Sequence, residues 1–539
     1  MMRRMGQNGA GRRQFLAALT LSVAGLPVMA GCGGRDSKWD AEPISASDLK
    51  VVALSDSVVV ADPALNRVLV LAGSSRGELQ LSNAPIGQGL LSLWAVPGAD
   101  RVLALSAGVQ PRLRSSDEKA SLTVVSGGLS AKVVARYELE QAFSKITVDP
   151  QGQWVVLAGD DKASGNSGAV VNPNELVLID ISDRRFVPVR KTLASFGSQP
   201  LRYTFTGELH FPDGTSGRLL LVETERDLTV INLANPEANE ITVQFQKTQG
   251  DQVAKPAGLS YHDSTDVSAT QIAVRFEGQS DVILIDMIAD DTQTHPFKLL
   301  PQLVDAGGIP SALELVNTDQ GVRLAALLPT TSRAALIDPQ TTIAQFIDLA
   351  APYTQFTLTT PEGTAGADEA LLWGANVTNV AFWALGQTGE QAFRSIESLE
   401  LQTGVGDVVE MPGSSRRRLL QAASGGQFFV LDLDRRQAFP MSTQFGHVQL
   451  SVSPDGKRAW AFEHGALDFG MIDLETMHVT ALRVDRPVDR VFDIQQPGNH
   501  SLAIALHAQG DLAATTLDGH NPDSTLSRFY GGLLLGGLQ

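Results

Sequence analysis

The residue with the clearest chemistry is Cys32, which carries the only thiol in the 539-residue chain. Met29-Ala30-Gly31 comes directly before it, and an apolar run from Phe15 to Val28 lies further upstream. Two arginines, Arg12 and Arg13, precede that run. A charged start, an apolar middle and small residues before a cleavage point are the three parts of a removable secretion signal. The run has 14 residues, fewer than the ~20 that a permanent membrane-spanning helix needs.

Two motifs in this segment match known patterns. Met29-Ala30-Gly31-Cys32 resembles the lipobox of bacterial lipoproteins, and Gly11-Arg12-Arg13-Gln14-Phe15-Leu16-Ala17 resembles the twin-arginine export motif. The resemblance implies that residues 1–31 are a signal peptide and that acyl chains are attached to Cys32. It also assigns Arg12, Arg13, Phe15 and Leu16 to recognition by the export machinery.

These motifs predict a lipoprotein anchored to a membrane of the cell envelope. Gly33 and Gly34 follow Cys32, where an Asp would signal inner-membrane retention in many bacteria with two membranes. In such a cell we therefore expect the outer membrane. Residues 33–47 contain Gly, Asp, Ser and Pro, so we expect residues 32–47 to be a lipidated tether.

Composition excludes several classes of function. Without residues 1–31 the chain has 38 basic and 59 acidic side chains, a formal charge of −21. A body this acidic repels phosphate backbones and anionic lipid headgroups, so nucleic acid is not an expected partner and the lipid must provide the link to the membrane. No thiol follows Cys32, which excludes disulfides, iron–sulfur clusters, c-type haem attachment and a cysteine nucleophile.

No local pattern indicates a catalytic or metal site. The nine histidines are scattered, and no two are two, three or four residues apart, so no adjacent metal-ligand pair is visible. We therefore expect no catalytic residues, no metal and no cofactor, although side chains from distant segments can still build a site that sequence spacing does not reveal.

Two long polar segments are candidates for binding. They are Gly108–Ala120 and Gly159–Pro173, and long loops on a rigid scaffold often carry binding residues. The alternative, which we weigh equally, is that these long loops are tolerated changes in sequence and length that have no function. The candidate partner-binding residues are Arg112, Arg114, Asp117, Glu118, Asp160, Asp161 and Asn166.

A short repeat predicts the architecture that would hold these loops. Two to four β-favouring residues followed by Asp or Asn recur at intervals of 52, 54, 52, 94 and 41 residues. The repeated polar residues are Asp180, Asn232, Asp286, Asp338, Asp432 and Asp473. A period in the forties to fifties made of strands and turns is typical of the blades of a β-propeller. We expect the repeated Asp to cap a turn at the end of a strand.

A second element supports the repeat. Ser453-Pro454-Asp455-Gly456 predicts a tight turn, because Pro presets φ, Asp bonds to nearby backbone and Gly accepts a positive φ. Its pairing with the downstream Ile472-Asp473-Leu474 resembles the YVTN and lactonase-like propeller superfamily. The resemblance spans most of residues 90–485 and implies the fold, but the namesake tetrapeptide is absent.

The sequence thus predicts an all-β protein with a single β-propeller at residues 48–528 and an apolar tail at 529–539. We expect about eight four-stranded blades, with seven or nine as alternatives. Both termini, Ser57–Leu81 and Arg490–Leu517, are expected to meet and complete the ring. The eight recognisable units cover residues 91–139, 144–191, 201–246, 256–299, 311–349, 354–401, 405–440 and 447–482.

The predicted function is a non-enzymatic scaffold that is anchored by lipid and binds a protein of the cell envelope. The first alternative is a propeller enzyme, a lactonase or lyase with its site at the central channel. The second is a carbohydrate or peptidoglycan binder. Fold alone does not separate these classes, and the sequence does not indicate an oligomeric state.

Overall fold

The computed structural model describes the following residues, all within the compact unit Pro43–Gln539. They are 49–74, 78–159, 172–193, 199–245, 255–262, 264–290, 296–318, 321–359, 369–385, 396–412, 414–442, 448–496, 498, 500–508 and 512–535. Within these ranges no helix is both long and apolar enough to cross a membrane.

Ten four-stranded antiparallel sheets make up the described chain, and we number these blades 1 to 10 in chain order. Blade 1 consists of β1 (Val51–Ala53), β2 (Ser57–Asp62), β3 (Arg67–Gly73) and β4 (Leu79–Pro85), and blade 2 of β5 (Leu90–Ala95), β6 (Arg101–Ser106), β7 (Ala120–Ser126) and β8 (Lys132–Leu139). Blade 3 consists of β9 (Lys145–Val148), β10 (Trp154–Ala158), β11 (Glu175–Asp180) and β12 (Val189–Thr192), and blade 4 of β13 (Pro200–Phe205), β16 (Leu219–Thr224), β17 (Asp227–Asn232) and β18 (Ile241–Gln244). Blade 5 consists of β19 (Pro256–Tyr261), β20 (Gln271–Phe276), β21 (Asp281–Ala289) and β22 (Phe297–Asp305).

Blade 6 consists of β23 (Ala312–Thr318), β24 (Gly321–Leu328), β25 (Arg333–Ile337) and β26 (Ala344–Asp348), and blade 7 of β27 (Gln355–Thr359), β28 (Glu369–Trp373), β29 (Asn379–Ala384) and β30 (Ile396–Glu400). Blade 8 consists of β31 (Val405–Met411), β32 (Ser414–Ala422), β33 (Gln427–Asp432) and β34 (Gln437–Ser442), and blade 9 of β35 (Gln449–Val452), β36 (Arg458–Phe462), β37 (Ala466–Asp473) and β38 (His478–Val488). Blade 10 consists of β39 (Arg490–Gln496), β40 (His500–His507), β41 (Ala513–Asp518) and β42 (Arg528–Tyr530).

The remaining described elements are short. β14 (Leu209–His210) and β15 (Ser216–Gly217) form a hairpin inside blade 4. The 3-10 turns are η2 (Pro63–Leu65), η4 (Val267–Ala269), η5 (Pro329–Thr331), η6 (Ser524–Leu526) and η7 (Leu533–Leu535).

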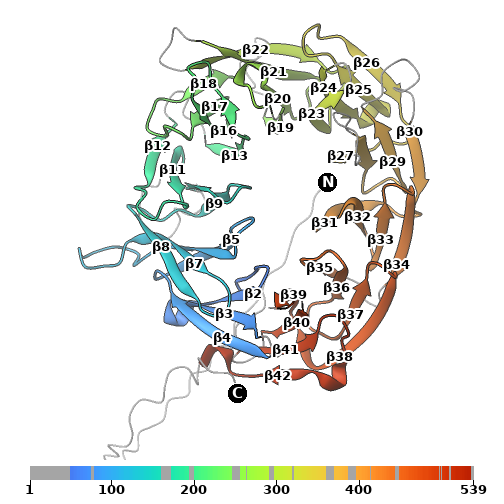
Figure 1. Cartoon of the computed structure of the whole chain (residues 1–539). Helices are drawn as coiled ribbons and strands as arrows, with labels where there is room; N and C mark the ends of the chain where they lie inside the picture. The colour runs from blue at the N-terminus through green and yellow to red at the C-terminus, as the bar shows by residue number, and fades with distance from the viewer. Residues whose placement is uncertain are drawn as a thin grey trace, which may run out of the picture. The chain divides into compact units, whose positions relative to one another are not determined.

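The blades form a ring in which the first strand of each lies nearest the centre and the fourth lies outermost (Figure 1). The second and third strands are buried on both faces, as in β2 and β3, which explains their unbroken apolar sequences. Fourth strands alternate between buried and exposed residues, as in β8. The recurrent apolar strings of the sequence are therefore third strands, held between two covering sheets.

Each pair of neighbouring blades has its own apolar core. Ten clusters of buried residues fill the ten seams. The seam between blades 10 and 1 joins Val58 and Leu71 to Ile494 and Ile504. The expectation that the two ends of the chain are neighbours in space is confirmed, and the ring is a closed β-propeller.

The predicted number of eight blades, with seven or nine as alternatives, is wrong, because the ring has ten. All eight recognised units are blades, but the two terminal segments do not share one. Each builds four strands of its own, from β1 to β4 and from β39 to β42. The error arises because β1 and β42 have only three residues each, too few to show a strand pattern in the sequence.

The expected turn-capping role of the repeated Asp or Asn is confirmed at five of the six positions. Typical is Asp180, whose Oδ1 accepts the backbone N–H of Ser182 at 2.9 Å. The same arrangement occurs at Asn232, Asp338, Asp432 and Asp473. Asp286 differs because β21 continues past it, and it accepts Gln271 Nε2 at 2.8 Å instead.

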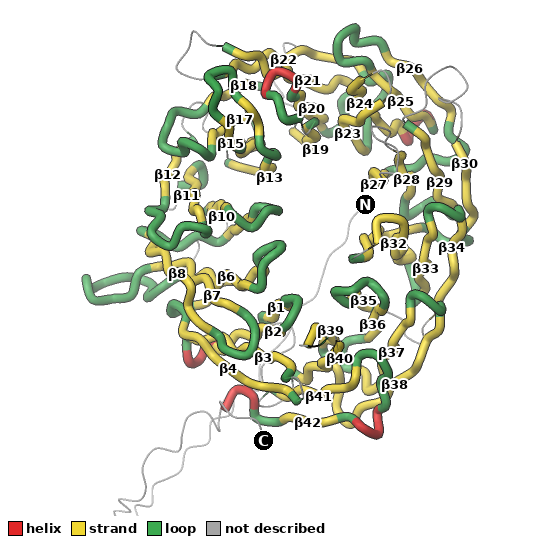
Figure 2. Tube along the Cα trace, viewed as in Figure 1, coloured by secondary structure: helices red, strands yellow, loops and turns green. Residues whose placement is uncertain are grey.

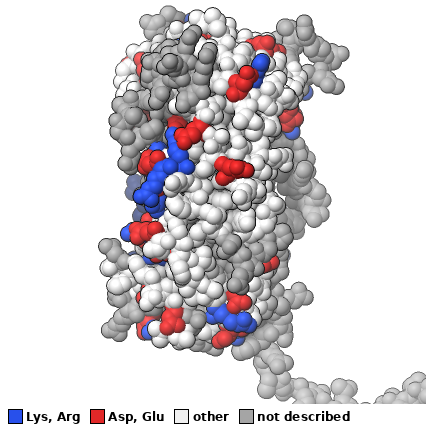
Figure 3. All heavy atoms as spheres, turned by 90° about the vertical axis from the view of Figure 1, so that its right-hand side faces the viewer, with Lys and Arg blue, Asp and Glu red and all other residues white. Residues whose placement is uncertain are grey.

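On the face shown in Figure 3, the charged side chains of the described residues lie in several groups separated by uncharged surface. Elsewhere in the contacts of the described residues, Arg333 and Asp348 form an exposed ion pair at 2.8 Å. The connection between β6 and β7 extends outward from the ring (Figure 2).

Candidate functional site

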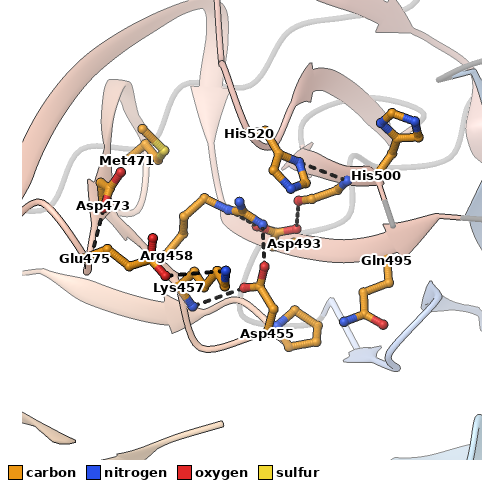
Figure 4. A pocket seen from close by; sticks show the side chains of 12 residues that line it. Asp455, Lys457, Arg458, Met471, Asp473, Glu475, Asp493, Gln495, His500 and His520 are labelled. Atoms are coloured by element: carbon orange, nitrogen blue, oxygen red, sulfur yellow. Dashed lines mark hydrogen bonds and ion pairs between the residues drawn. The ribbon is translucent and has the colours of Figure 1, made fainter. Parts of the chain in front are cut away.

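A polar cavity of about 510 Å³ lies between blades 9 and 10. Blade 9 contributes Asp455, Lys457, Arg458, Asp473 and Glu475, together with Pro454 and Met471. Blade 10 contributes Asp493, Gln495, His500, Ser501 and His520 (Figure 4). Ligand pockets commonly have volumes of roughly 300–1,000 Å³, so this cavity has the size of a site for a small molecule.

Strand topology explains why residues so far apart in sequence meet here. In a four-stranded antiparallel blade, the connections from strand one to two and from strand three to four lie at the same edge. The blade 9 residues lie in or near the turns after β35 and β37. His500 and His520 lie at the corresponding connections of blade 10, where His500 is the first residue of β40. We call this edge of the ring the cavity edge.

The floor of the cavity is an ionic network centred on Arg458. Its Nη2 lies 3.1 Å from Asp455 Oδ2, and its Nε lies 3.3 Å from Asp493 Oδ2. Trp460 Nε1 also donates to Asp493 at 3.2 Å, and the Ser501 hydroxyl donates to the other oxygen. Because Arg458 and Asp493 come from different blades, this network joins blade 9 to blade 10.

The pKa values of the two carboxylates of the floor are shifted in opposite directions. Burial raises the pKa of Asp493, although Ser501, Arg458 and Trp460 oppose the shift. Burial also acts on Asp455, but hydrogen bonds from Ser453 and the Lys457 backbone, with the charges of Arg458 and His520, outweigh it and lower the pKa. Asp455 is thus a stable anion beside the guanidinium.

Ser501, His520 and Asp493 lie together but do not form a catalytic triad. The Ser501 hydroxyl donates to Asp493, whereas a nucleophilic serine would donate to histidine. His520 Nδ1 instead accepts the Ser501 backbone N–H at 3.3 Å. This bond places the proton of neutral His520 on Nε2, so the imidazole serves as a hydrogen-bond donor.

The charged residues at the rim form hydrogen bonds and ion pairs mainly within blade 9 rather than across the two blades. Asp473 Oδ1 accepts the backbone N–H groups of Glu475 and Thr476 at 2.9 and 2.8 Å. Lys457 Nζ lies 3.4 Å from Glu475 Oε1. Among the described residues, no group of three His, Cys, Asp or Glu has an arrangement that could hold a metal ion.

The predicted loop Gly108–Ala120 lies elsewhere. It connects the second and third strands of blade 2, so by the same topology it lies at the edge opposite the cavity edge. Asp117 Oδ2 accepts the backbone N–H groups of Leu113 and Arg114 at 2.9 and 2.7 Å. These bonds fold the loop tip into a defined turn.

The base of this loop is attached to the outer strand β8. Glu118 forms an ion pair with Arg136, and Lys119 Nζ lies 3.4 Å from Glu138 and 3.3 Å from Glu140. Arg112 and Arg114 remain exposed at the tip, where Leu113 is 83% exposed. The structure therefore divides the predicted residues into two that hold the loop, Asp117 and Glu118, and two that face solvent.

Other predicted residues lie outside the described part of the chain. They are Asp160, Asp161 and Asn166 of the second loop, and Arg12, Arg13, Phe15, Leu16 and Cys32 of the export and lipidation motifs. The ends of the second loop, β10 and β11, are described. They confirm that it connects the second and third strands of blade 3.

Sequence reasoning missed the cavity because its residues come from separate turns of two blades. The Ser-Pro-Asp-Gly motif was recognised as a turn, but blade 10 was not recognised as a complete blade. His500 and His520 therefore had no predicted position. Their separation of 20 residues becomes informative only when both are placed at one edge of the same blade.

No protein-family model matches the chain, and no curated protein sequence matches it. Solved structures do resemble it in fold. They include the dihydro-heme d1 dehydrogenase NirN in complex with DHE, at 12% identity and TM-score 0.41, covering 71% of this chain and 78% of that chain. Apo AztD from Citrobacter koseri has 10% identity and TM-score 0.34, covering 72% and 96%. Virginiamycin B lyase from Staphylococcus aureus has 10% identity and TM-score 0.31, covering 56% and 96%. These proteins are β-propellers.

Proposed function

We propose that this β-propeller is a lipid-anchored, non-enzymatic scaffold of the cell envelope that binds a protein partner through the loop Gly108–Ala120. The observation that carries the proposal is the tip of this loop. It presents one apolar side chain, Leu113, between two exposed arginines, Arg112 and Arg114. Arginine is enriched in protein–protein interfaces and often contributes strongly to their binding energy, and an exposed apolar side chain gains free energy when a partner buries it.

The loop is held in shape before a partner arrives. Asp117 fixes the turn at the tip, and Glu118 and Lys119 attach the base to β8. A loop that is already ordered loses less conformational entropy on binding than a flexible one. The two arginines on an otherwise acidic body favour an acidic partner surface with an apolar pocket for Leu113.

Anchoring supports the same function. Acylated Cys32 would hold the propeller at the membrane, and residues 32–47 would separate the ring from the lipid surface. Stable anchoring generally needs more than one acyl chain, which a lipidated cysteine with an acylated α-amine provides. In a cell with two membranes, the proposed location is the outer membrane.

The binding role is tested with a triple variant, Arg112→Ala, Leu113→Ala and Arg114→Ala. We expect it to fold normally and to lose the envelope protein that co-purifies with the parent after detergent solubilisation. A matched control is Arg184→Ala, Arg185→Ala and Val187→Ala, which also removes two exposed arginines and one residue that is 77% exposed. Equal co-purification with both triple variants would contradict the assignment of the loop.

The anchoring role is tested separately with Cys32→Ala. This variant should leave the membrane fraction, whereas the loop variant should remain there. Replacing Arg12 and Arg13 by Lys should retain the precursor in the cytoplasm, because the export receptor reads the arginine pair. Membrane retention of Cys32→Ala after an alkaline wash would contradict the lipid anchor.

A further inference from the structure

We infer that the cavity between blades 9 and 10 binds a small polar ligand that carries an ammonium group. This site lies at the cavity edge and is independent of the proposed scaffold function, which uses the opposite edge. It combines three properties, namely a polar cavity open to solvent, a floor that is already complete, and a rim that carries exposed polar and charged side chains.

The floor defines the shape of the site. Arg458, Asp455 and Asp493 satisfy one another, and Trp460 and Ser501 complete the contacts of Asp493. A ligand is therefore not needed to neutralise Arg458. Since the network connects two blades, it holds both walls of the cavity in position, as a binding site requires.

The charge of the lining selects the sign of the ligand. Four carboxylates, those of Asp455, Asp473, Glu475 and Asp493, face two cationic side chains, Lys457 and Arg458. These carboxylates and cationic side chains together carry a formal charge of −2. An anion would meet net repulsion here, whereas an ammonium group would be attracted.

The acceptors for the ammonium group lie on the blade 9 wall. Asp473 lies at the end of β37 and uses Oδ1 to cap its turn. Glu475 is exposed at the rim, with Lys457 near one of its oxygens. These two carboxylates give an ammonium group acceptors at the mouth of the cavity.

The blade 10 wall supplies polar groups for the rest of the ligand. His520 directs its Nδ1 to the Ser501 backbone, which leaves Nε2–H as a donor. His500 and the Gln495 side-chain amide also line the cavity, and both are exposed (Figure 4). Imidazole and amide groups bind hydroxyl and carbonyl oxygens, so a ligand with an ammonium group and several hydroxyls satisfies both walls.

The probe series is glucosamine, glucose and glucuronate, which share a ring and differ in charge. Calorimetric titration of the full-length protein in detergent should show saturable binding of glucosamine. Glucose should bind about tenfold more weakly, the effect expected for one partly screened charge pair. Glucuronate should show no saturable binding. Equal binding of glucosamine and glucuronate, or no saturable binding of glucosamine up to about 10 mM, would overturn the inference.

A variant assigns the binding to this cavity. Asp473→Asn with Glu475→Gln removes two charges, while Asn keeps the oxygen that caps the turn. We expect glucosamine affinity to fall by about tenfold or more, so that glucosamine and glucose bind alike. The matched control is Asp180→Asn, which alters the same turn-capping position in blade 3 and should bind as the parent does. Equal glucosamine binding by the double variant and the control would contradict the site.

The variants in this experiment distinguish a failure of the ligand-binding inference from a failure of the scaffold proposal. The triple variant of the loop Gly108–Ala120 should retain the parental affinity for glucosamine. Failure of glucosamine to bind would leave the loop and its partner unaffected. Loss of glucosamine binding in the loop variant would contradict the independence of the two sites.

Discussion

Single acidic residues illustrate how burial controls charge in this protein. The Glu223 side chain on β16 is 1% exposed, and Arg202 Nη1 lies 3.5 Å from its Oε1. Neither carboxylate oxygen has a hydrogen-bond partner within the described residues. Burial raises the pKa of Glu223, and the charges of Arg202 and Arg275 only partly oppose this shift.

This shift predicts a pH dependence of stability. Because the folded chain holds the Glu223 proton more tightly than the unfolded chain, the free energy of unfolding falls as pH rises above the ordinary value of 4.5. Glu223→Gln should therefore raise the free energy of unfolding by about 1 kcal/mol near pH 7.5 and change it little near pH 4. Thermal unfolding at both pH values measures this difference. The exposed neighbour Glu225 provides a control, Glu225→Gln, and a lower melting temperature for Glu223→Gln near pH 7.5 would contradict the account.

The roles of individual residues were predictable where they depend on local chain geometry. The repeated Asp caps its turn because the acceptor and the N–H groups are two or three residues apart, as at Asp473. Glu223 and Arg202 could not be paired from sequence, because their proximity depends on the register of β13 against β16. Contacts across a sheet or a seam require the fold to be known first.

At the scale of strands and turns, some seams have a buried salt bridge between neighbouring blades, here called an ionic lock, in addition to their apolar core. Asp149, in the turn after β9, is fully buried and binds Arg218 of blade 4. Arg218 Nη1 and Nη2 lie 2.5 and 2.7 Å from the two oxygens of Asp149. Burial alone would raise the pKa of Asp149. The hydrogen bonds from Arg218 and from the Gln151 and Gln153 backbones outweigh this effect, so the pKa in the folded protein is lowered.

Breaking this lock should strongly destabilise the ring. Arg218→Met leaves the buried carboxylate without its cation, and the loss of one partner of a buried pair typically costs about 3–5 kcal/mol. Since the pKa of Asp149 is lowered in the folded state, its contribution is present above the unfolded pKa and is lost as pH falls through the folded pKa. The destabilisation by Arg218→Met should therefore be smaller in acid than at neutral pH.

An exposed pair provides the control for this prediction. Arg333 and Asp348 have side chains that are 49% and 83% exposed, and surface pairs contribute roughly 0–1 kcal/mol. Arg333→Met should change the melting temperature little. Equal losses of stability for Arg218→Met and Arg333→Met would show that burial does not determine the strength of these pairs.

The number of blades shows what limits prediction at this scale. Third strands repeat clearly because both their faces are covered, so their apolar sequence is continuous. First and fourth strands are short or alternate with polar residues, as in β1 and β42. The sequence therefore predicts the eight internal blades, whereas it does not show that each terminal segment builds a blade of its own.

At the scale of the whole molecule, the C-terminal segment fastens the closing seam. Leu533 is fully buried between blades 10 and 1, and its N–H donates to Leu512. Tyr530 Oη accepts the Leu79 N–H at 3.2 Å, and Arg67 Nη2 donates to the Leu534 carbonyl at 2.9 Å. The described part of the predicted apolar tail therefore packs on the ring.

Removal of this fastening predicts failure of the ring as a unit. Deletion of residues 528–539 removes β42 and Leu533, which exposes the edge of β41 and part of the seam core. Exposed strand edges and apolar seams favour aggregation, so we expect aggregates in size-exclusion chromatography. Deletion of residues 536–539 alone leaves every contact described above in place and should yield a monodisperse protein. A soluble, monodisperse protein without residues 528–539 would contradict the proposed fastening.

The central claim, partner binding through one loop, is tested most directly by site-specific photo-crosslinking in intact cells. A photoreactive residue is placed at position 113 at the loop tip, and separately at position 187, a similarly exposed apolar position on blade 3. The account predicts one discrete protein adduct from position 113 that disappears when Arg112 and Arg114 are replaced by Ala. It predicts no such adduct from position 187. The same adduct from both positions, or one that persists without the two arginines, would contradict it.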